Sequence, residues 1–215
     1  MKFLCKALLL SVLTVCSLGA IEVRNKVFTA ELDPKGAVLT KLTVKGKPWV
    51  AVLQGAGSFD EQIGQNQGPS MQTIEYTNRL DFALESFVTG KKETQVVFTL
   101  RSLAYPGLRL RKIYCFSAEK SEFTLKWELC NTGTAPLSLS LCSRAYLLRS
   151  GMVNSYIQPR VKGTKEFRDS EKVVFSRLPW KPFLAVRNEF DDGLVLRLPA
   201  ADTAGVLNWI PKGLF

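Results

Sequence analysis

The sequence predicts an all-β protein, an antiparallel β-sandwich, and three observations support this fold class. From residue 21 onward, short runs rich in Val, Leu, Phe and Thr are separated by turn residues. No window carries the apolar stripe of an amphipathic helix. Apolar and polar residues alternate along the central runs, as in a sheet with one buried face. With 215 residues, 46% of them hydrophobic, the chain can bury one core, so we expect a single domain.

Residues 1–19 have the features of a secretory signal peptide. Two lysines precede an uncharged run from Ala7 to Val15, and small residues follow it. The run is shorter than the roughly 20 residues that cross a bilayer, and no later segment is longer and equally apolar. We expect cleavage near residue 19, a domain over residues 20–215, and an exported location, periplasmic or secreted. An uncleaved anchor and a lipoprotein signal at Cys16 stay open as alternatives.

The charge of the chain is basic but dispersed. Lys and Arg number 29 against 19 Asp and Glu, and removal of the two leader lysines leaves 27 basic residues. Such a balance suits nucleic acid or an anionic membrane when the basic residues form a dense tract. Here they are scattered among the strands, so we expect a solvated surface and no nucleic-acid partner.

Cysteine and histidine usage restricts the chemistry. After the leader the cysteines are Cys115, Cys130 and Cys142, an odd number, and we expect all of them to be free thiols packed as small apolar groups. The chain has no histidine, which excludes a Ser-His-Asp triad, a Cys-His pair and a zinc site with histidine ligands. We expect no metal and no cofactor.

The first strands are predicted to form a meander followed by a loop. Pro34 and Gly36 suit a tight turn between residues 27–32 and residues 37–44. Residues 55–71 are rich in Gly, Gln and Ser and are predicted as a long surface loop. Such a loop is either a binding loop or an insertion without function.

Two neighbouring segments, residues 107–116 and 123–131, predict a hairpin whose register buries one face. Slipping this register by one residue would send the apolar side chains into water. The predicted pairs are Phe116 with Phe123, Tyr114 with Leu125, Lys112 with Trp127 and Leu110 with Leu129 on the apolar face, and Arg111 with Glu128 and Arg109 with Cys130 on the charged face. The face that carries Trp127 is therefore predicted to be core.

A third strand is predicted to continue the same face. A turn at residues 132–134 would bring Leu139 opposite Trp127 and Cys142 beside Thr124. Cys115 would lie on the other side of Thr124, about 9–10 Å from Cys142 and too far for a disulfide.

The C-terminal part is predicted to return to strands after a loop-like, basic region at residues 150–172. Residues 173–180, 183–190 and 193–199 read as strands, and Asp-Asp-Gly at residues 191–193 predicts a hairpin. The sequence stops directly after apolar residues, so we expect that the domain is incomplete at Phe215.

The order of these pieces resembles a known family. Residues 31–49, ELDPKGAVLTKLTVKGKPW, are similar to the opening of galactose-mutarotase-like domains, and residues 108–139 resemble their central strands. The periplasmic domain of the YidC membrane insertase belongs to the same superfamily, and the chain is similar to it as well. The resemblance covers residues 21–148 closely and residues 180–209 loosely.

The resemblance implies a β-supersandwich of two large antiparallel sheets, with carbohydrate bound across a concave face in the sugar-active members. It also implies that catalytic epimerases of the family use a histidine and a late glutamate. This chain has no histidine and stops before the region where that glutamate would lie. We therefore predict a domain without epimerase activity.

A carbohydrate site needs aromatic platforms beside planar polar groups. The residues with suitable chemistry are Arg79, Arg144, Tyr146, Trp180, Arg187, Asn208 and Trp209. Packing in the core or at a sheet edge is the alternative for both tryptophans. Paired acids, as in glycosidases, occur at residues 60–61 and 191–192, and we interpret both pairs as solvated turn residues.

Three functions of different classes follow. The favoured one is an exported, non-catalytic carbohydrate-binding domain, with a carbohydrate or glycan as partner. The second is a periplasmic YidC-like domain that acts through contacts with another exported protein. The third is a partial aldose-epimerase-like enzyme whose active residues lie beyond Phe215.

Overall fold

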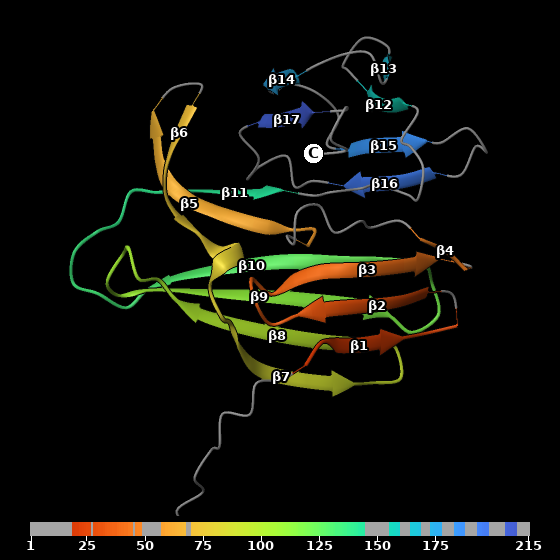
Figure 1. The fold of residues 1–215 in the computed structure, drawn as a ribbon, viewed down its shortest axis with the longest axis horizontal. Helices are drawn as coiled ribbons and strands as arrows, with labels where there is room; N and C mark the ends of the chain where they lie inside the picture. The colour runs from red at the N-terminus through yellow and green to blue at the C-terminus, as the bar shows by residue number, and fades with distance from the viewer. Residues whose placement is uncertain are drawn as a thin grey trace, which may run out of the picture.

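The computed structural model describes residues 19–26, 28–44, 46–48, 57–67 and 70–144, together with the backbone of short strands between residues 155 and 209. Almost every described element is an antiparallel strand, so the predicted all-β fold class is confirmed (Figure 1). In the described part of the chain, no helix is long and apolar enough to pass through a bilayer.

The first sheet is the predicted N-terminal meander. Its strands are β1 (Ile21–Arg24), β2 (Phe28–Asp33), β3 (Val38–Val44) and β4 (Lys47–Pro48), in the order β1-β2-β3-β4. The turn between β2 and β3 uses Gly36 at φ 75°, a conformation that glycine adopts without steric cost. The predicted turn at Pro34 and Gly36 is thus confirmed.

The second sheet lies face to face with the first (Figure 1). It contains β7 (Ala83–Thr89), β8 (Glu93–Arg101), β9 (Leu108–Ser117) and β10 (Phe123–Asn131), in the order β10-β9-β8-β7. The register of β9 and β10 pairs Phe116 with Phe123 and Lys112 with Trp127. Every pair predicted for this hairpin is therefore confirmed.

A third sheet replaces the predicted loop at residues 55–71, and that prediction was wrong. It contains β5 (Asp60–Gln67), β6 (Ser70–Tyr76) and β11 (Ser140–Arg144), in the order β11-β5-β6. Their polar composition concealed these strands, because ladder hydrogen bonds join backbone groups and do not require apolar side chains. A short 3-10 helix, η1 (Thr77–Arg79), follows β6.

The predicted pairing of the third strand with β10 was also wrong, because β11 pairs with β5. The chain after β10 does not fold back in a tight turn. The Thr132 amide donates to the Gly107 carbonyl at 2.7 Å, and a Cβ on Gly107 would meet the Gly133 nitrogen at 2.7 Å. This contact directs the chain toward the β8–β9 loop, so residues 132–139 cross to the third sheet.

The remaining strands form two small sheets. Their bounds are β12 (Ser155–Pro159), β13 (Thr164–Arg168), β14 (Val173–Arg177), β15 (Phe183–Arg187), β16 (Gly193–Arg197) and β17 (Gly205–Trp209). The sheet orders are β13-β12-β15-β16 and β14-β17. The hairpin predicted at residues 191–193 is confirmed by the pairing of β15 with β16. The loop predicted over residues 150–172 was wrong in part, since it contains β12 and β13.

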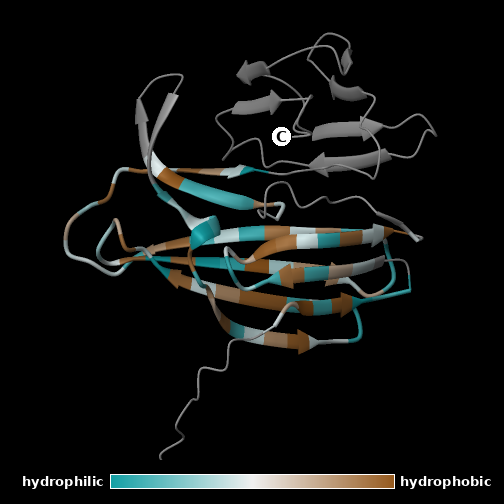
Figure 2. Cartoon of the chain, in the orientation of Figure 1, coloured by the Kyte–Doolittle hydropathy of each residue, from teal (hydrophilic) through white to brown (hydrophobic). Residues whose placement is uncertain are grey.

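The core lies between the first two sheets and extends to the third. Its largest buried apolar side chains include Leu32 and Leu39 from the first sheet, Phe98 and Phe116 from the second, and Ile63 from β5. Apolar stretches follow the strands of both main sheets in Figure 2. Trp127 is partly buried and packs against this cluster. The prediction that its face of the sheet is core is confirmed.

Cys115, Cys130 and Cys142 are free thiols, as predicted, but their environment differs from the prediction. Cys115 is half-buried, whereas Cys130 and Cys142 are exposed and do not pack as apolar core groups. The predicted position of Cys142 beside β10 was wrong, because β11 pairs with β5 instead.

Candidate functional site

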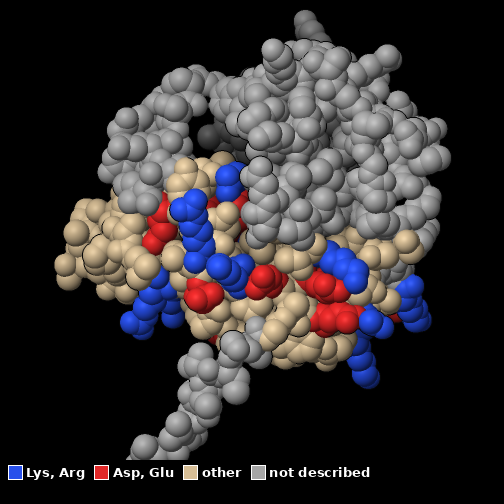
Figure 3. Space-filling model, viewed as in Figure 1, with Lys and Arg blue, Asp and Glu red and all other residues tan. Residues whose placement is uncertain are grey.

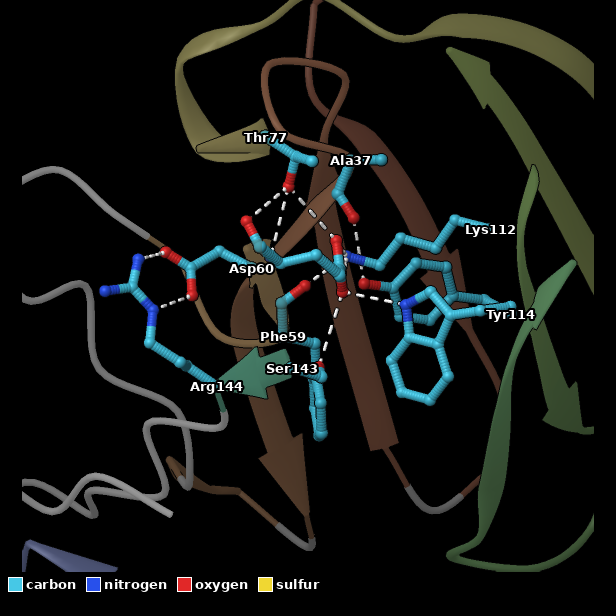
Figure 4. A network of polar contacts seen from close by, with 10 residues as sticks. Ala37, Phe59, Asp60, Thr77, Lys112, Tyr114, Ser143 and Arg144 are labelled. Atoms are coloured by element: carbon cyan, nitrogen blue, oxygen red, sulfur yellow. Dashed lines mark hydrogen bonds and ion pairs between the residues drawn. The ribbon is translucent and has the colours of Figure 1, made fainter. Parts of the chain in front are cut away.

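A buried ion pair lies where the second and third sheets meet. Lys112 on β9 and Glu61 on β5 are both fully buried, and the Lys112 Nζ lies 2.9 Å from the Glu61 Oε1. The same ammonium group donates to the Phe59 carbonyl (Figure 4). Each charge therefore has a hydrogen-bonding partner of opposite charge in a site without contact with solvent.

Glu61 also binds elements on either side of this pair. Its Oε1 accepts a hydrogen bond from the Trp127 indole at 2.9 Å and one from the Ser143 hydroxyl at 3.4 Å. The Thr77 hydroxyl donates to the Glu61 carbonyl at 3.0 Å and accepts from the Glu61 amide at 3.1 Å. Strands β5, β9, β10 and β11 and the helix η1 thus meet at one carboxylate.

Burial dominates the electrostatics of the pair. Loss of solvent raises the pKa of Glu61 above its ordinary value, and the attraction of Lys112 opposes that effect. Burial likewise lowers the pKa of Lys112, opposed by the attraction of Glu61. Removal of either partner would leave an isolated charge in an apolar surrounding. We conclude that each member of this pair needs the other at the junction of the sheets.

A second ion pair connects the buried network to the surface. Arg144 on β11 binds Asp60 through both sides of its guanidinium group, with its Nε 2.7 Å from the Asp60 Oδ1. The Asp60 side chain is fully buried. The Arg144 guanidinium lies 6.0 Å from the centroid of the Tyr76 ring, and the Arg79 guanidinium lies 5.6 Å from the same centroid. Tyr76 is 43% exposed, so two arginines lie close to an exposed aromatic ring.

The turn that carries Arg79 is held by backbone hydrogen bonds to the β2–β3 turn. The Gly36 amide donates to the Leu80 carbonyl at 2.7 Å, and the Phe82 amide donates to the Pro34 carbonyl at 3.0 Å. A Cβ on Gly36 would meet the Asn78 Cα at 2.8 Å, so only glycine allows this close approach. The β2–β3 turn therefore holds η1 and the residues directly after it.

A surface hollow of about 640 Å³ opens beside η1. Arginine, leucine and a few smaller side chains line it: Arg79, Leu80, Asp81, Ala83, Thr99, Leu100, Arg101, Leu103 and Arg109. Its volume is in the range of small-molecule sites. Arg79 lines the hollow and also lies close to the Tyr76 ring.

The structure brings two of the sequence-predicted site residues together. Arg79 and Arg144 both lie beside Tyr76, at the sites described above. Tyr146 and Trp180 lie outside the described residues. For the other three candidates only the backbone is described. Arg187 lies on β15 opposite Ser155, and Asn208 and Trp209 lie on β17 opposite Val174 and Val173. Their role in binding stays a prediction.

The interpretation of residues 60–61 as solvated turn residues was wrong. Both carboxylates lie on β5 and are buried, and each is paired with a cation. A signal in the sequence could have shown this. Lys112 was predicted on the apolar face opposite Trp127, and a lysine in that position needs a buried acid as partner. The flanking Phe59 and Ile63 also indicate burial.

Sequence reasoning also missed Tyr76, Arg101 and Arg109. Arg101 lies directly opposite Arg109 across β8 and β9. The register that reveals this pair depends on the β8–β9 loop, which the sequence does not define. On the face seen in Figure 3, basic and acidic side chains alternate over the described residues without forming a continuous basic field. Among these residues no cluster of three or more Cys, Asp or Glu could hold a metal ion.

Comparison with solved structures shows the galactose mutarotase-like fold. The chain is similar to a galactose mutarotase-like protein from Lactobacillus casei ATCC 334, with a TM-score of 0.59 and 12% sequence identity. The match covers 90% of this chain and 83% of that one. No family model matches the sequence, and no curated protein matches it. The chain therefore has the galactose mutarotase-like fold that the sequence resemblance implied.

Proposed function

We propose that the chain is an exported, non-catalytic carbohydrate-binding domain. One observation carries the proposal: the guanidinium groups of Arg79 and Arg144 both lie within about 6 Å of the centroid of the exposed Tyr76 ring, and Arg79 also lines an open hollow. Sugar rings stack their C–H faces on aromatic rings, while guanidinium and carboxylate groups bind the hydroxyls. Tyr76 ends β6, Arg144 lies on β11, and Arg79 lies on a turn fixed by backbone hydrogen bonds, so little backbone entropy is lost when a ligand binds.

The arrangement of acidic residues supports binding without hydrolysis. A glycosidase needs two carboxyl groups that face the same sugar bond. Asp60 and Glu61 are instead buried and bound to Arg144 and Lys112. Asp81 is the acidic residue among the described residues that line the hollow. A single carboxylate in such a site serves as a hydrogen-bond acceptor for a sugar hydroxyl.

Export is proposed from the leader. Residues 1–19 combine basic residues, a short apolar run and small residues, which is the order of a secretory signal. Expression of the full chain with its leader, followed by N-terminal sequencing of exported protein, should give a new N-terminus near residue 20. Retention of the intact leader on cytoplasmic protein would contradict this part of the proposal.

Binding is tested with the full chain on a glycan array and by calorimetry at millimolar sugar. We expect Tyr76→Ala and Arg79→Ala to weaken binding by about tenfold or more, since each removes a direct contact. Lys126→Ala, an exposed position on β10, is the matched control. The variant Arg144→Ala is unsuitable, because it would leave the buried Asp60 without its partner. Absence of any bound sugar for the unmodified chain would refute the proposed function.

A second candidate function, contact with another exported protein, is favoured by the edge of the second sheet. Strand β7 pairs with β8 on one side, and no other described strand pairs with it. Its Phe87 and Val88 are 45% and 57% exposed. Exposed strand edges accept an added strand from a partner. Cross-linking of the exported chain in its own compartment, with Val88→Lys as the blocking variant, would distinguish this function from sugar binding.

A further inference from the structure

The hollow beside η1 carries an excess of positive charge. Arg79, Arg101 and Arg109 line it together with the single carboxylate of Asp81. Among the described residues, no carboxylate lies within ion-pair distance of these arginines. Guanidinium groups do not lose their proton at physiological pH. The hollow is therefore permanently cationic.

Two of these arginines are placed against each other by the sheet itself. Arg101 lies directly opposite Arg109 in the β8–β9 register, and like charges in such a pair destabilise a sheet. Arg111, two residues further along β9, has the opposite environment: it is bound to Glu85 at 2.6 Å and also to Glu128. Arg111 thus makes two ion pairs, whereas Arg109 has a longer-range attraction to Glu85 and no ion pair among the described residues.

Polar contacts outside the hollow hold the segments that line it. The Glu75 carboxylate, on β6, accepts hydrogen bonds from the Ser102 hydroxyl at 2.7 Å and from the Leu103 amide at 2.7 Å. These bonds fix the β8–β9 loop on one side. On the other side, the Thr77 contacts with Glu61 fix η1. The arginines consequently project from a preorganised frame.

We infer that this hollow is an anion-binding subsite that receives the carboxylate or phosphate group of an acidic carbohydrate. The inference rests on the proposed function and specifies its ligand. Paired guanidinium groups bind planar carboxylates and phosphates through parallel hydrogen bonds. A bound anion would also remove the repulsion between Arg101 and Arg109. The leucines that share the lining, Leu80, Leu100 and Leu103, offer apolar contact to the ring of the sugar.

The test is calorimetry of the full chain with glucuronic acid, glucose 6-phosphate, glucose and inorganic phosphate. We expect at least one acidic sugar to bind about tenfold more tightly than glucose. Arg101→Gln and Arg109→Gln should each weaken that binding by about tenfold, a larger factor than either variant weakens any binding of glucose. Added salt should weaken the acidic sugar more than glucose. Lys126→Gln, which removes an exposed charge from β10 of the same sheet, is the matched control, and circular dichroism verifies that every variant folds.

The outcomes separate this inference from the proposed function. If glucose binds as tightly as both acidic sugars, the inference is overturned and carbohydrate binding stands. If an acidic sugar binds but neither arginine variant weakens it, the hollow is not the subsite and the inference is overturned. If inorganic phosphate binds and no sugar does, the acidic-carbohydrate assignment and the proposed function both fall. A preference for glucuronic acid over glucose 6-phosphate, or the reverse, identifies the anionic group.

Discussion

Two clusters of charged side chains in this protein differ in how completely their charges are paired. Around Glu61, every buried charge has a partner, and the network joins strands from the second and third sheets (Figure 4). In the hollow, three arginines face one carboxylate, and two of them lie directly opposite each other. Solvent screens the repulsion between the exposed arginines of the hollow, whereas the charges around Glu61 are buried and are not screened by solvent. The comparison indicates that the buried cluster supports the fold, while the open one is available to a ligand.

The largest effect is expected from breaking the buried pair. Lys112→Met removes the cation and leaves Glu61 charged and buried, and the free energy of unfolding should fall by about 3–5 kcal/mol. The double variant Lys112→Met with Glu61→Gln removes both charges and should recover part of that loss. Urea denaturation of the full chain measures each value.

Lys126→Met serves as the control for this prediction, because Lys126 is exposed on β10 and its loss should change stability by less than about 0.5 kcal/mol. Equal losses for the Lys112 and Lys126 variants would show that the pair contributes nothing to the junction of the sheets. A double variant less stable than Lys112→Met alone would show that the isolated carboxylate is not the source of the loss.

The next effect concerns the turn that supports the hollow. Gly36→Ala introduces a Cβ that would lie 2.8 Å from the Asn78 Cα, at a φ of 75°. We expect a loss of about 2–3 kcal/mol in the free energy of unfolding, combining backbone strain with displacement of η1. Gly46→Ala is the matched control, since Gly46 has φ 77° with nothing within 4 Å of an added Cβ. Thermal unfolding compares the two, and equal losses would mean that contact with η1 is unimportant.

Two buried tyrosine hydroxyls differ in whether they have a hydrogen-bond partner, and this difference predicts different effects of removing them. The Tyr114 hydroxyl donates to the Ala37 carbonyl at 2.9 Å, whereas the buried Tyr105 hydroxyl has no hydrogen-bond partner among the described residues. Tyr114→Phe should cost about 1–2 kcal/mol, because it leaves the Ala37 carbonyl unsatisfied. Tyr105→Phe should be neutral or slightly stabilising. Urea denaturation tests both, and a larger loss for Tyr105→Phe would reverse the ranking.

The sequence predicted the two main sheets because their side chains alternate. The β9–β10 register followed from a single pairing of Phe116 with Phe123, since a slip of one residue would expose the apolar face. It did not predict β5 and β6, whose polar side chains carry no such alternation. It also misplaced β11, because the choice between β10 and β5 depends on the contact of Gly107 with residues 132–133, far away in sequence.

The candidate site was predicted less completely, for a related reason. Arg79 and Arg144 were selected for their chemistry, and they do lie together at Tyr76. The hollow, however, is formed by the end of β8, the start of β9 and η1, and no local pattern indicates that these segments meet. Charge compensation is a long-range property, so a sequence alone does not show which arginines lack partners.

The smallest effects come from two arginines on the same face of the second sheet. Arg101→Gln should raise the free energy of unfolding by about 0.2–1 kcal/mol, since it relieves the repulsion of Arg109. Arg111→Gln should lower it, because Arg111 binds Glu85 and Glu128. The two changes are chemically identical, so opposite signs in urea denaturation would isolate the effect of compensation, and equal signs would contradict it.

The loss of unfolding free energy caused by Arg111→Gln should depend on pH. The hydrogen bond from Arg111 is the largest cause that lowers the pKa of Glu85 below its ordinary value of 4.5. A carboxyl whose pKa is lowered by folding contributes stability above its unfolded pKa and loses it as the pH falls through the folded pKa. The cost of Arg111→Gln should therefore be present at neutral pH and shrink at pH values below 4.5. Solvent screens this exposed pair, so the change is small and should shrink further in high salt. A cost that stays constant down to strongly acidic pH would show that Arg111 stabilises the sheet by packing of its alkyl chain and not by its charge.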